Sequence, residues 1–230
     1  MVKNFQEFCS ELIRCGFSMG GGNDKGIFAI IDYDWKEQSN IETPVMWHTG
    51  DPETDPWEWR IRVLRERSDI AYAKVFFKAS GYITKPWYAD FICARRGKKD
   101  YNSMYSDGEI TEMSAAVYDI ISRYDALPMH EIKSLGGFSG VDSAKFDKAI
   151  TELQMKMLIT MCGAVRKKNK NGEEYGWNST IMCTVESFWK DEASKALTLD
   201  PKKSYDKIKE QILKLNPNAA ESKIKKFILG

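Results

Sequence analysis

The segment MLITMCGAVRKKNKNGEEYGWNSTIMCTV, residues 157–185, indicates the fold of the second half of the chain. Residues 157–165 and 180–185 are rich in apolar and β-branched side chains, which is typical of strands. Between them lies a basic and polar stretch with Asn171-Gly172, a dipeptide that tolerates the positive φ angles of a tight turn. The segment therefore predicts a β-hairpin with a basic end.

Three amphipathic segments precede this hairpin. Their apolar residues recur at helical spacing over 110–124, 129–135 and 143–154. Asp142 or Ser143 suits the N-cap of the third helix. The order helix, helix, helix, strand, basic turn, strand is that of a winged helix-turn-helix. We therefore expect an α+β fold, mostly helical, with a winged helix-turn-helix domain and a small β-hairpin wing.

The rest of the chain divides around this unit. We expect an N-terminal α/β region with a Trp-rich helical unit at 1–97, a linker at 98–108, the winged-helix domain at 109–190 and a C-terminal helical tail at 191–230. Periodicity predicts further helices at 4–13, 55–67, 68–77, 204–215 and 221–229, and one that starts after Thr84 and closes at 95–99. It predicts a strand at 27–35 and a strand or extended segment at 41–47.

The stretch DPETDPWEWR, residues 51–60, begins the Trp-rich unit. Asp55 is a favourable N-cap, Pro56 fits the first helical turn, and Glu58 stands where a capping box reaches back to the N-cap. Capping therefore accounts for Asp55 and Glu58 without catalysis.

A candidate pocket is the alternative interpretation of this stretch. Aromatic rings beside arginines can hold a flipped or single-stranded base, and carboxylates can activate water. The same tryptophans also suit a core. The candidate residues are Trp47, Asp51, Asp55, Trp57, Glu58, Trp59, Arg60 and Arg62. His48, Asp51, Glu53 and Asp55 follow no metal-ligand spacing, so we expect no metal and no cofactor.

The predicted winged helix supplies a second candidate site. Its third helix would present Lys145, Lys148 and Thr151, and the wing Arg166, Lys167, Lys168 and Lys170, to nucleic acid. Asp147 and Glu152 make that helix nearly neutral, which fits a protein-docking module equally well.

Composition limits the class of protein. The 230 residues carry a net charge of +1, but acids dominate 24–58 and cations dominate 60–99. This asymmetry permits a basic surface for an anionic partner such as DNA, and it equally permits the two regions to pair with each other. No apolar run approaches the roughly 18 residues of a membrane span, and charges near the N-terminus argue against export. Five cysteines without a CxxC motif indicate reduced thiols in a cytoplasmic protein.

The run MWHTGDPETDPWEWRIRVLRERSDIAYAKVFFKASGYITKPWYADFICARR, residues 46–96, resembles a bacterial family of proteins related to AlkZ, also called YcaQ. The resemblance extends from about Thr43 to Trp189. AlkZ DNA glycosylases consist of tandem winged helices and excise damaged bases. The resemblance thus implies a winged-helix fold and makes 55–97 a plausible earlier helical or winged-helix unit.

The chain departs from those glycosylases at the catalytic motif. They use Gln-x-Asp to position water, whereas no glutamine here has an aspartate two residues on. No catalytic residue carries over; Asp55 or Glu58 would be the best substitute acids. Three hypotheses stay open: a winged-helix protein that binds nucleic acid, a divergent glycosylase or other hydrolase, and a protein-docking module.

Overall fold

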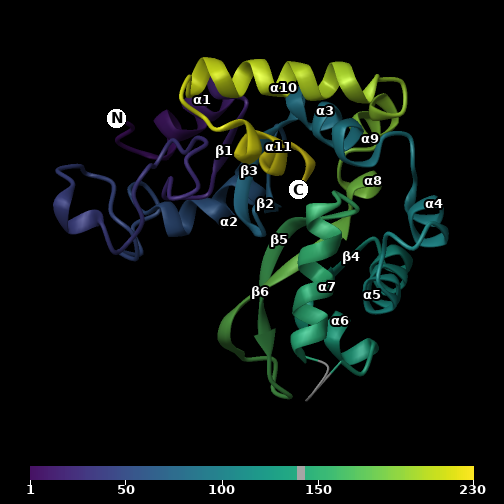
Figure 1. Cartoon of the computed structure of the whole chain (residues 1–230). Helices are drawn as coiled ribbons and strands as arrows, with labels where there is room; N and C mark the ends of the chain where they lie inside the picture. Colours follow the sequence, from purple (N-terminus) through teal and green to yellow (C-terminus); the bar gives the residue numbers. More distant parts are fainter. Residues whose placement is uncertain (139–142) are drawn as a thin grey trace.

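The computed structural model describes residues 1–138 and 143–230 (Figure 1). Its helices are α1 (Phe5–Cys15), the 3-10 turn η1 (Gln38–Asn40), α2 (Pro56–Glu66), α3 (Lys85–Arg96), α4 (Tyr101–Ser106), α5 (Glu112–Arg123), α6 (Met129–Leu135), α7 (Ser143–Met155), α8 (Val185–Phe188), α9 (Lys190–Ala196), α10 (Pro201–Leu215) and α11 (Glu221–Leu229). Its strands are β1 (Phe17–Met19), β2 (Ile70–Phe76), β3 (Ala79–Thr84), β4 (Ala126–Pro128), β5 (Ile159–Lys168) and β6 (Glu174–Thr184).

All described strands belong to one antiparallel sheet, in the order β1-β3-β2-β5-β6-β4. The N-terminal strands meet the C-terminal strands where Tyr72 of β2 pairs with Met161 of β5. The sheet therefore runs through both halves of the chain, and the predicted α+β class is confirmed.

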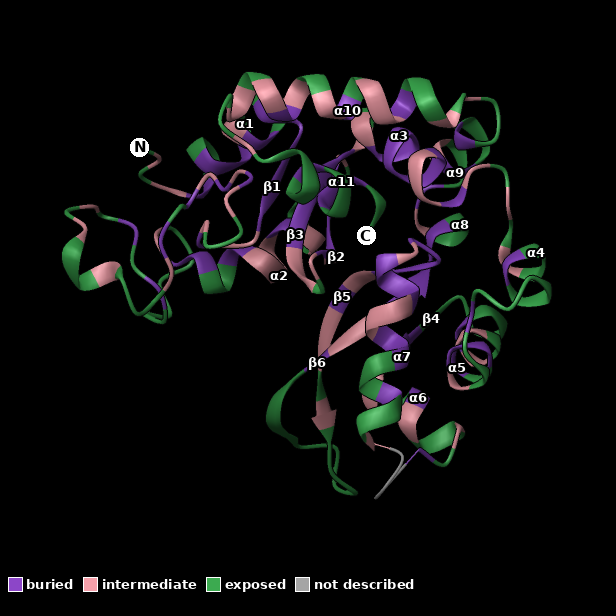
Figure 2. Ribbon diagram, viewed as in Figure 1, coloured by how far each residue is buried: buried purple, intermediate pink, exposed green. Residues whose placement is uncertain are grey.

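The predicted hairpin is confirmed as β5 and β6, which pair from Ile159↔Thr184 to Lys168↔Glu174. Its turn is closed by the Asn169 side chain, which accepts hydrogen bonds from the backbone N–H groups of Asn171 and Glu173. The hairpin extends away from β1 and β3, and its far end is exposed (Figures 1 and 2). The three helices predicted before it are confirmed as α5, α6 and α7, whereas Asp142 lies outside the described residues.

The helix predicted at 68–77 is wrong, because this segment forms β2. β2 lies between β3 and β5, and all but one of its residues are buried. A strand buried on both faces has no alternation of polar and apolar residues, so its periodicity cannot be told from that of a buried helix. Ser80 and Gly81, which follow that segment, lie within β3.

The strand predicted at 27–35 is also wrong. Its backbone makes only isolated bonds, such as Met19 N–H to the Phe28 carbonyl at 3.0 Å. Ile27, Ile31 and Tyr33 are nevertheless buried. The β-branched and aromatic side chains of this segment fill the core without joining the sheet. Residues 41–47 form no strand; the segment bends at 43–44 and enters a turn at 47.

Buried apolar residues form three clusters (Figure 2). One joins β1–β3 to α3, α10 and α11, the second lies among α5, α6, α7 and the hairpin base, and the third joins α1 and α2 to the segment 31–47. The C-terminal helices thus cover the N-terminal half of the sheet. The segment 98–108, predicted as a linker, contains α4.

None of the helices in the described ranges combines the length and the apolar character that crossing a membrane requires.

Candidate nucleic-acid interface

The hairpin presents its basic residues to solvent. Arg166, Lys168 and Lys170 are exposed and Lys167 is half-buried. None of these four side chains forms an ion pair with a described residue. Against Glu173 and Glu174 of the same hairpin end, these four cations leave an excess of two positive charges, which favours an anionic partner.

Two exposed aromatic residues lie beside these cations. The side chain of Trp177 is 89% exposed and that of Tyr175 is 52% exposed. Tyr175 pairs with Lys167 across the hairpin. Between this pair and the pair Val165↔Ser179 the register of the two strands shifts, and Gly176, which lies in this stretch of β6, adopts a φ of 69°. Neither aromatic residue was predicted as part of a site; the available signal was their position beside a charged turn, outside any apolar alternation. These two exposed rings and the four neighbouring cations make the end of the hairpin a candidate binding surface.

Helix α7 carries the other candidate cations. Lys145 and Lys148 are exposed, and Thr151 is half-buried, with its hydroxyl donating to the Asp147 carbonyl at 2.9 Å. The two acids of this helix are held by neighbours. Asp147 lies 3.7 Å from the Lys133 ammonium, and Glu152 accepts hydrogen bonds from two hydroxyl groups, those of Ser114 at 2.6 Å and Thr111 at 2.8 Å.

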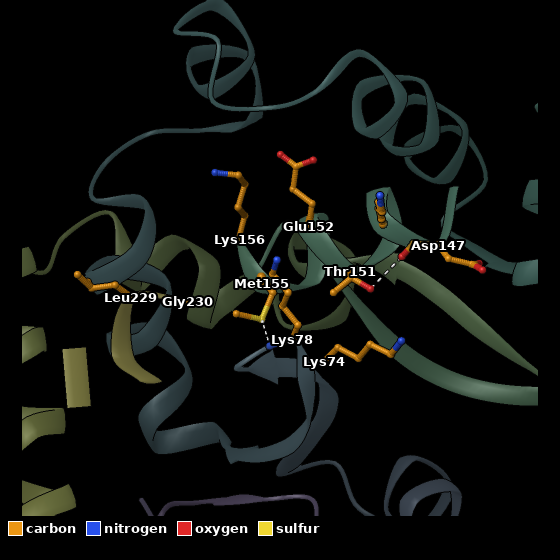
Figure 3. Close-up of a pocket in the computed structure, with 10 residues that line it drawn as sticks. Lys74, Lys78, Asp147, Thr151, Glu152, Met155, Lys156, Leu229 and Gly230 are labelled. Atoms are coloured by element: carbon orange, nitrogen blue, oxygen red, sulfur yellow. Dashed lines mark hydrogen bonds between the residues drawn. The ribbon is translucent and has the colours of Figure 1, made fainter. Parts of the chain in front are cut away.

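A groove of about 750 Å³ runs between α7, β2 with the turn that follows it, and the end of α11 (Figure 3). Four lysines line it: Lys74, Lys78, Lys148 and Lys156. None of their ammonium groups forms an ion pair with a described residue. Met155 and Leu229 add apolar surface to the lining. We call this feature the lysine groove.

Lys74, Lys78 and Lys156 were not among the site residues predicted from the sequence. A helix at 68–77 would have placed Lys74 on a different surface, and only the pairing of β2 with β5 brings it to α7. The backbone N–H of Lys74 donates to the Gln154 side-chain oxygen at 2.9 Å, and that of Lys78 donates to the Met155 sulfur at 3.3 Å. The groove is therefore formed by both halves of the chain.

In the candidate pocket, Asp55 is a structural residue. Its carboxylate is buried and accepts hydrogen bonds from three backbone N–H groups, those of His48 at 3.0 Å, Gly50 at 2.9 Å and Trp57 at 2.8 Å. The predicted N-cap of α2 is thus confirmed. The same carboxylate also fixes the loop before the helix, where His48 adopts φ 63°.

The predicted capping box is wrong. Glu58 is exposed, and its side chain makes no hydrogen bond with any described residue. The backbone N–H of Asp55, which Glu58 would have bonded, donates instead to the Asp51 carbonyl at 2.9 Å. A preceding turn therefore takes the place of the glutamate.

Two of the candidate tryptophans are buried. Trp59 has no exposed surface and donates its indole N–H to the Pro52 carbonyl at 3.1 Å, and Trp47 donates to the Tyr33 carbonyl at 3.2 Å. Both rings therefore belong to the core, and their indole N–H groups are already hydrogen-bonded within the protein.

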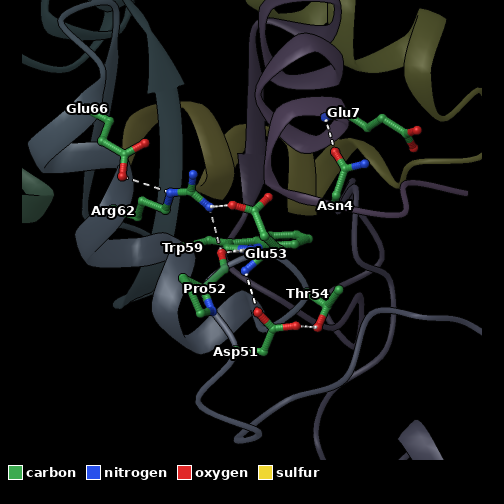
Figure 4. Close-up of polar contacts among 9 residues, drawn as sticks. All are labelled: Asn4, Glu7, Asp51, Pro52, Glu53, Thr54, Trp59, Arg62 and Glu66. Atoms are coloured by element: carbon green, nitrogen blue, oxygen red, sulfur yellow. Dashed lines mark hydrogen bonds and ion pairs between the residues drawn. The ribbon is translucent and has the colours of Figure 1, made fainter.

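Charged residues surround the start of α2 (Figure 4). Arg62 pairs with Glu53 at 2.7 Å and with Glu66 at 2.8 Å. Burial lowers the pKa of Arg62, but its hydrogen bonds to the two glutamates outweigh burial and raise that pKa above its usual value. Asp51 is exposed, and hydrogen bonds from the backbone of Glu53 and the hydroxyl of Thr54 lower its pKa. The Arg62–Glu53 ion pair thus joins the basic region 60–99 to the acidic region 24–58.

The remaining candidates, Trp57 and Arg60, belong to an exposed aromatic group. The Arg60 guanidinium lies 3.3 Å from the Trp57 ring centroid, and its Nε–H donates to the Trp57 carbonyl at 2.7 Å. The His48 ring lies 4.9 Å from Trp57 and 6.4 Å from Trp35, which is 54% exposed. The structure therefore divides the candidate pocket between a buried set and a surface set.

The five cysteines are free thiols, as expected. Burial raises the pKa of Cys9 to about 11 and that of Cys15 to about 12. In the part of the chain that the structure describes, no three His, Cys, Asp or Glu side chains gather closely enough to hold a metal ion.

The sequence profile of the family described as AlkZ related matches residues 2–229. Comparison with curated proteins gives no match, and neither does comparison with solved structures. The family match spans nearly the whole chain, from before α1 to the end of α11. The chain belongs to the AlkZ-related family.

Proposed function

We propose that this protein binds double-stranded DNA through α7 and the β5–β6 hairpin, which act together as a winged helix-turn-helix. The observation that carries the proposal is the hairpin, where four cations without ion pairs to described residues flank the exposed Tyr175 and Trp177. The name of the AlkZ-related family suggests a role related to DNA repair and supports the same direction.

The order of elements supports the winged-helix assignment. From α5 to β6 the chain runs helix, short strand, helix, helix, strand, strand, and the three strands pair as β5-β6-β4. In such a unit the last helix enters the major groove and the wing contacts the backbone. Lys145, Lys148 and Thr151 of α7 would then face the DNA.

The hairpin chemistry suits contact with the DNA backbone. Lysine and arginine side chains neutralise phosphates and release counterions, so binding weakens as salt rises. A ring such as that of Trp177 can stack on a base or insert between base pairs. Contacts of both kinds depend little on the base sequence, so we expect the hairpin to contribute affinity for nucleic acid and little sequence specificity.

The proposal assigns no catalytic role to Asp55. An acid that activates water needs access to the reacting atoms, whereas Asp55 is buried and its carboxylate accepts three backbone hydrogen bonds. The glycosylase alternative therefore draws no support from Asp55, and the exposed Glu58 side chain forms no hydrogen bond with any described residue.

The test removes the hairpin cations. The triple variant Lys167→Gln, Lys168→Gln, Lys170→Gln should bind undamaged duplex more weakly than the unmodified protein. Its plot of log affinity against log salt should be flatter by about 0.9 for each phosphate that the protein no longer neutralises. Fluorescence anisotropy between about 50 and 200 mM salt measures both quantities. Abasic and alkylated duplexes measured alongside show whether damage alters affinity.

A matched control removes three exposed lysines far from the hairpin: Lys190, Lys203 and Lys214. This control should keep the affinity and the salt dependence of the unmodified protein. Equal behaviour of the two triple variants would refute the role of the hairpin, and failure of the unmodified protein to bind any duplex would refute DNA binding altogether.

A further inference from the structure

We propose that the lysine groove is a second DNA-binding site, which holds the phosphodiester backbone of the strand that α7 and the hairpin engage. The inference rests on the proposed function and adds the N-terminal half of the chain to the binding surface. Its central residues are Lys74 and Lys78, which lie outside the predicted winged helix.

The groove is continuous with the proposed DNA-facing side of α7. Lys148 and Thr151 belong both to the outward face of this helix and to the lining of the groove. In Figure 3, Lys74, Lys78 and Lys156 project around the same helix from neighbouring segments. A backbone that passes along α7 would therefore meet lysines of β2 and of the turn after it.

Charge balance in the groove favours an anion. Its lining has the four lysines against the acids Asp147 and Glu152. Asp147 lies near Lys133, and Glu152 is bonded to hydroxyl groups, so within the described ranges neither acid forms an ion pair with a groove lysine. Like charges repel each other, so four ammonium groups around one groove are most stable when an anion lies among them.

A further cation lies close to the groove. The Arg95 guanidinium donates to four backbone carbonyls, those of Val75 at 2.6 Å, Met155 at 2.7 Å, Ile228 at 2.8 Å and Phe227 at 3.0 Å. No carboxylate of a described residue pairs with it. Met155 is both its acceptor and part of the groove lining. Arg95 therefore adds positive potential beside the groove.

The form of the groove suits a sugar-phosphate chain. Its lysines extend on flexible stems from backbone that is fixed by the Lys74–Gln154 and Lys78–Met155 hydrogen bonds. Lysines are point charges that contact phosphates without demanding one geometry. The apolar surface of Met155 and Leu229 can contact the sugars. Phosphates at several positions along a strand match this arrangement.

The experiment compares DNA binding of the double variant Lys74→Gln, Lys78→Gln with that of the unmodified full chain. Two fewer neutralised phosphates should lower the slope of log affinity against log salt by about 1.8 and weaken binding by at least about tenfold near 0.1 M salt. The charge-preserving variant Lys74→Arg, Lys78→Arg should keep both. The matched control Lys190→Gln, Lys203→Gln removes the same charge elsewhere and should leave both unchanged.

The outcomes separate this inference from the proposed function. If the hairpin triple variant loses salt dependence while Lys74→Gln, Lys78→Gln keeps it, the groove is not a DNA site and the winged-helix proposal stands. If the unmodified protein binds no duplex, the proposed function fails first. If the unmodified protein binds a mononucleotide more tightly than a duplex, and Lys74→Gln, Lys78→Gln loses that binding, the groove binds a small ligand and not the DNA backbone. Lys156→Gln tests the groove independently if the double variant does not fold.

Discussion

At the scale of single residues, Asp55 determines how α2 begins. One carboxylate accepts N–H groups from the loop at His48 and Gly50 and from the first turn of α2 at Trp57. It therefore fixes the loop and the helix relative to each other. Asp55, a candidate catalytic acid in the sequence, instead accepts hydrogen bonds from backbone N–H groups. A buried backbone donor without a partner is costly, so these bonds stabilise the fold.

Asp55→Ala should lower the free energy of unfolding by about 2 to 4 kcal/mol. The substitution removes an N-cap and leaves buried N–H groups without acceptors. Urea denaturation followed by circular dichroism measures the change. Glu58→Gln, three residues away and exposed, is the control and should shift stability by less than about 0.5 kcal/mol. Equal effects of the two substitutions would contradict the structural role of Asp55.

At the scale of elements, the docking of α11 depends on Arg95 of α3. Its guanidinium bonds the carbonyls of Phe227 and Ile228 near the end of α11, that of Val75 in β2 and that of Met155 in α7. Burial lowers the pKa of Arg95 to about 9, and the group stays charged at neutral pH. Carbonyl dipoles from three elements replace the carboxylate that a buried cation usually requires.

Arg95→Lys should loosen α11 and lower the free energy of unfolding by about 2 kcal/mol or more. Lysine has a compact ammonium group that cannot reach four carbonyls, so some acceptors are left without a donor. Hydrogen exchange should become faster over residues 221–229, and urea denaturation gives the stability. Arg123→Lys, at an exposed position of α5, should change neither measurement. Unchanged exchange in Arg95→Lys would show that apolar packing alone holds α11.

At the scale of the whole molecule, one sheet runs through both halves, and Gln154 of α7 adds a side-chain contact between them. Gln154 is buried; its side-chain oxygen accepts the Lys74 N–H of β2 at 2.9 Å, and its amide donates to the Ile150 carbonyl at 3.0 Å. β2 and β5 themselves pair at Tyr72↔Met161. One glutamine side chain thus connects the proposed DNA-binding helix to the N-terminal strands and fixes one wall of the lysine groove.

Gln154→Met should destabilise the whole protein by about 1 to 3 kcal/mol. Methionine nearly preserves the volume but leaves the Lys74 N–H without its acceptor. Urea denaturation gives the stability, and hydrogen exchange at Lys74 reports the broken hydrogen bond. Gln6→Met, on the exposed side of α1, is the control. A variant as stable as the unmodified protein would show that the Gln154–Lys74 hydrogen bond adds nothing to the other contacts between the halves.

Elements governed by local chemistry followed from the sequence. The hairpin was predictable from Asn171-Gly172, α6 from the apolar spacing of 129–135, and the start of α2 from Asp55-Pro56. In each case the stabilising bonds join residues only a few positions apart, or the pattern repeats within one element. Such interactions depend little on the rest of the molecule.

Contacts between distant segments were decided only by the tertiary structure. The segment 70–76 is a strand because β3 and β5 bond both of its edges, although its own periodicity suits a helix equally well. The lysine groove exists because that strand lies against α7, and Trp177 is exposed because it belongs to the end of the hairpin, where residues 168–178 are all exposed. The sequence by itself determined the hairpin turn, the Asp55 N-cap and the amphipathic helices of this protein, through short-range interactions. Tertiary pairing and burial determined which charges stay unpaired, since that depends on neighbours remote in the chain.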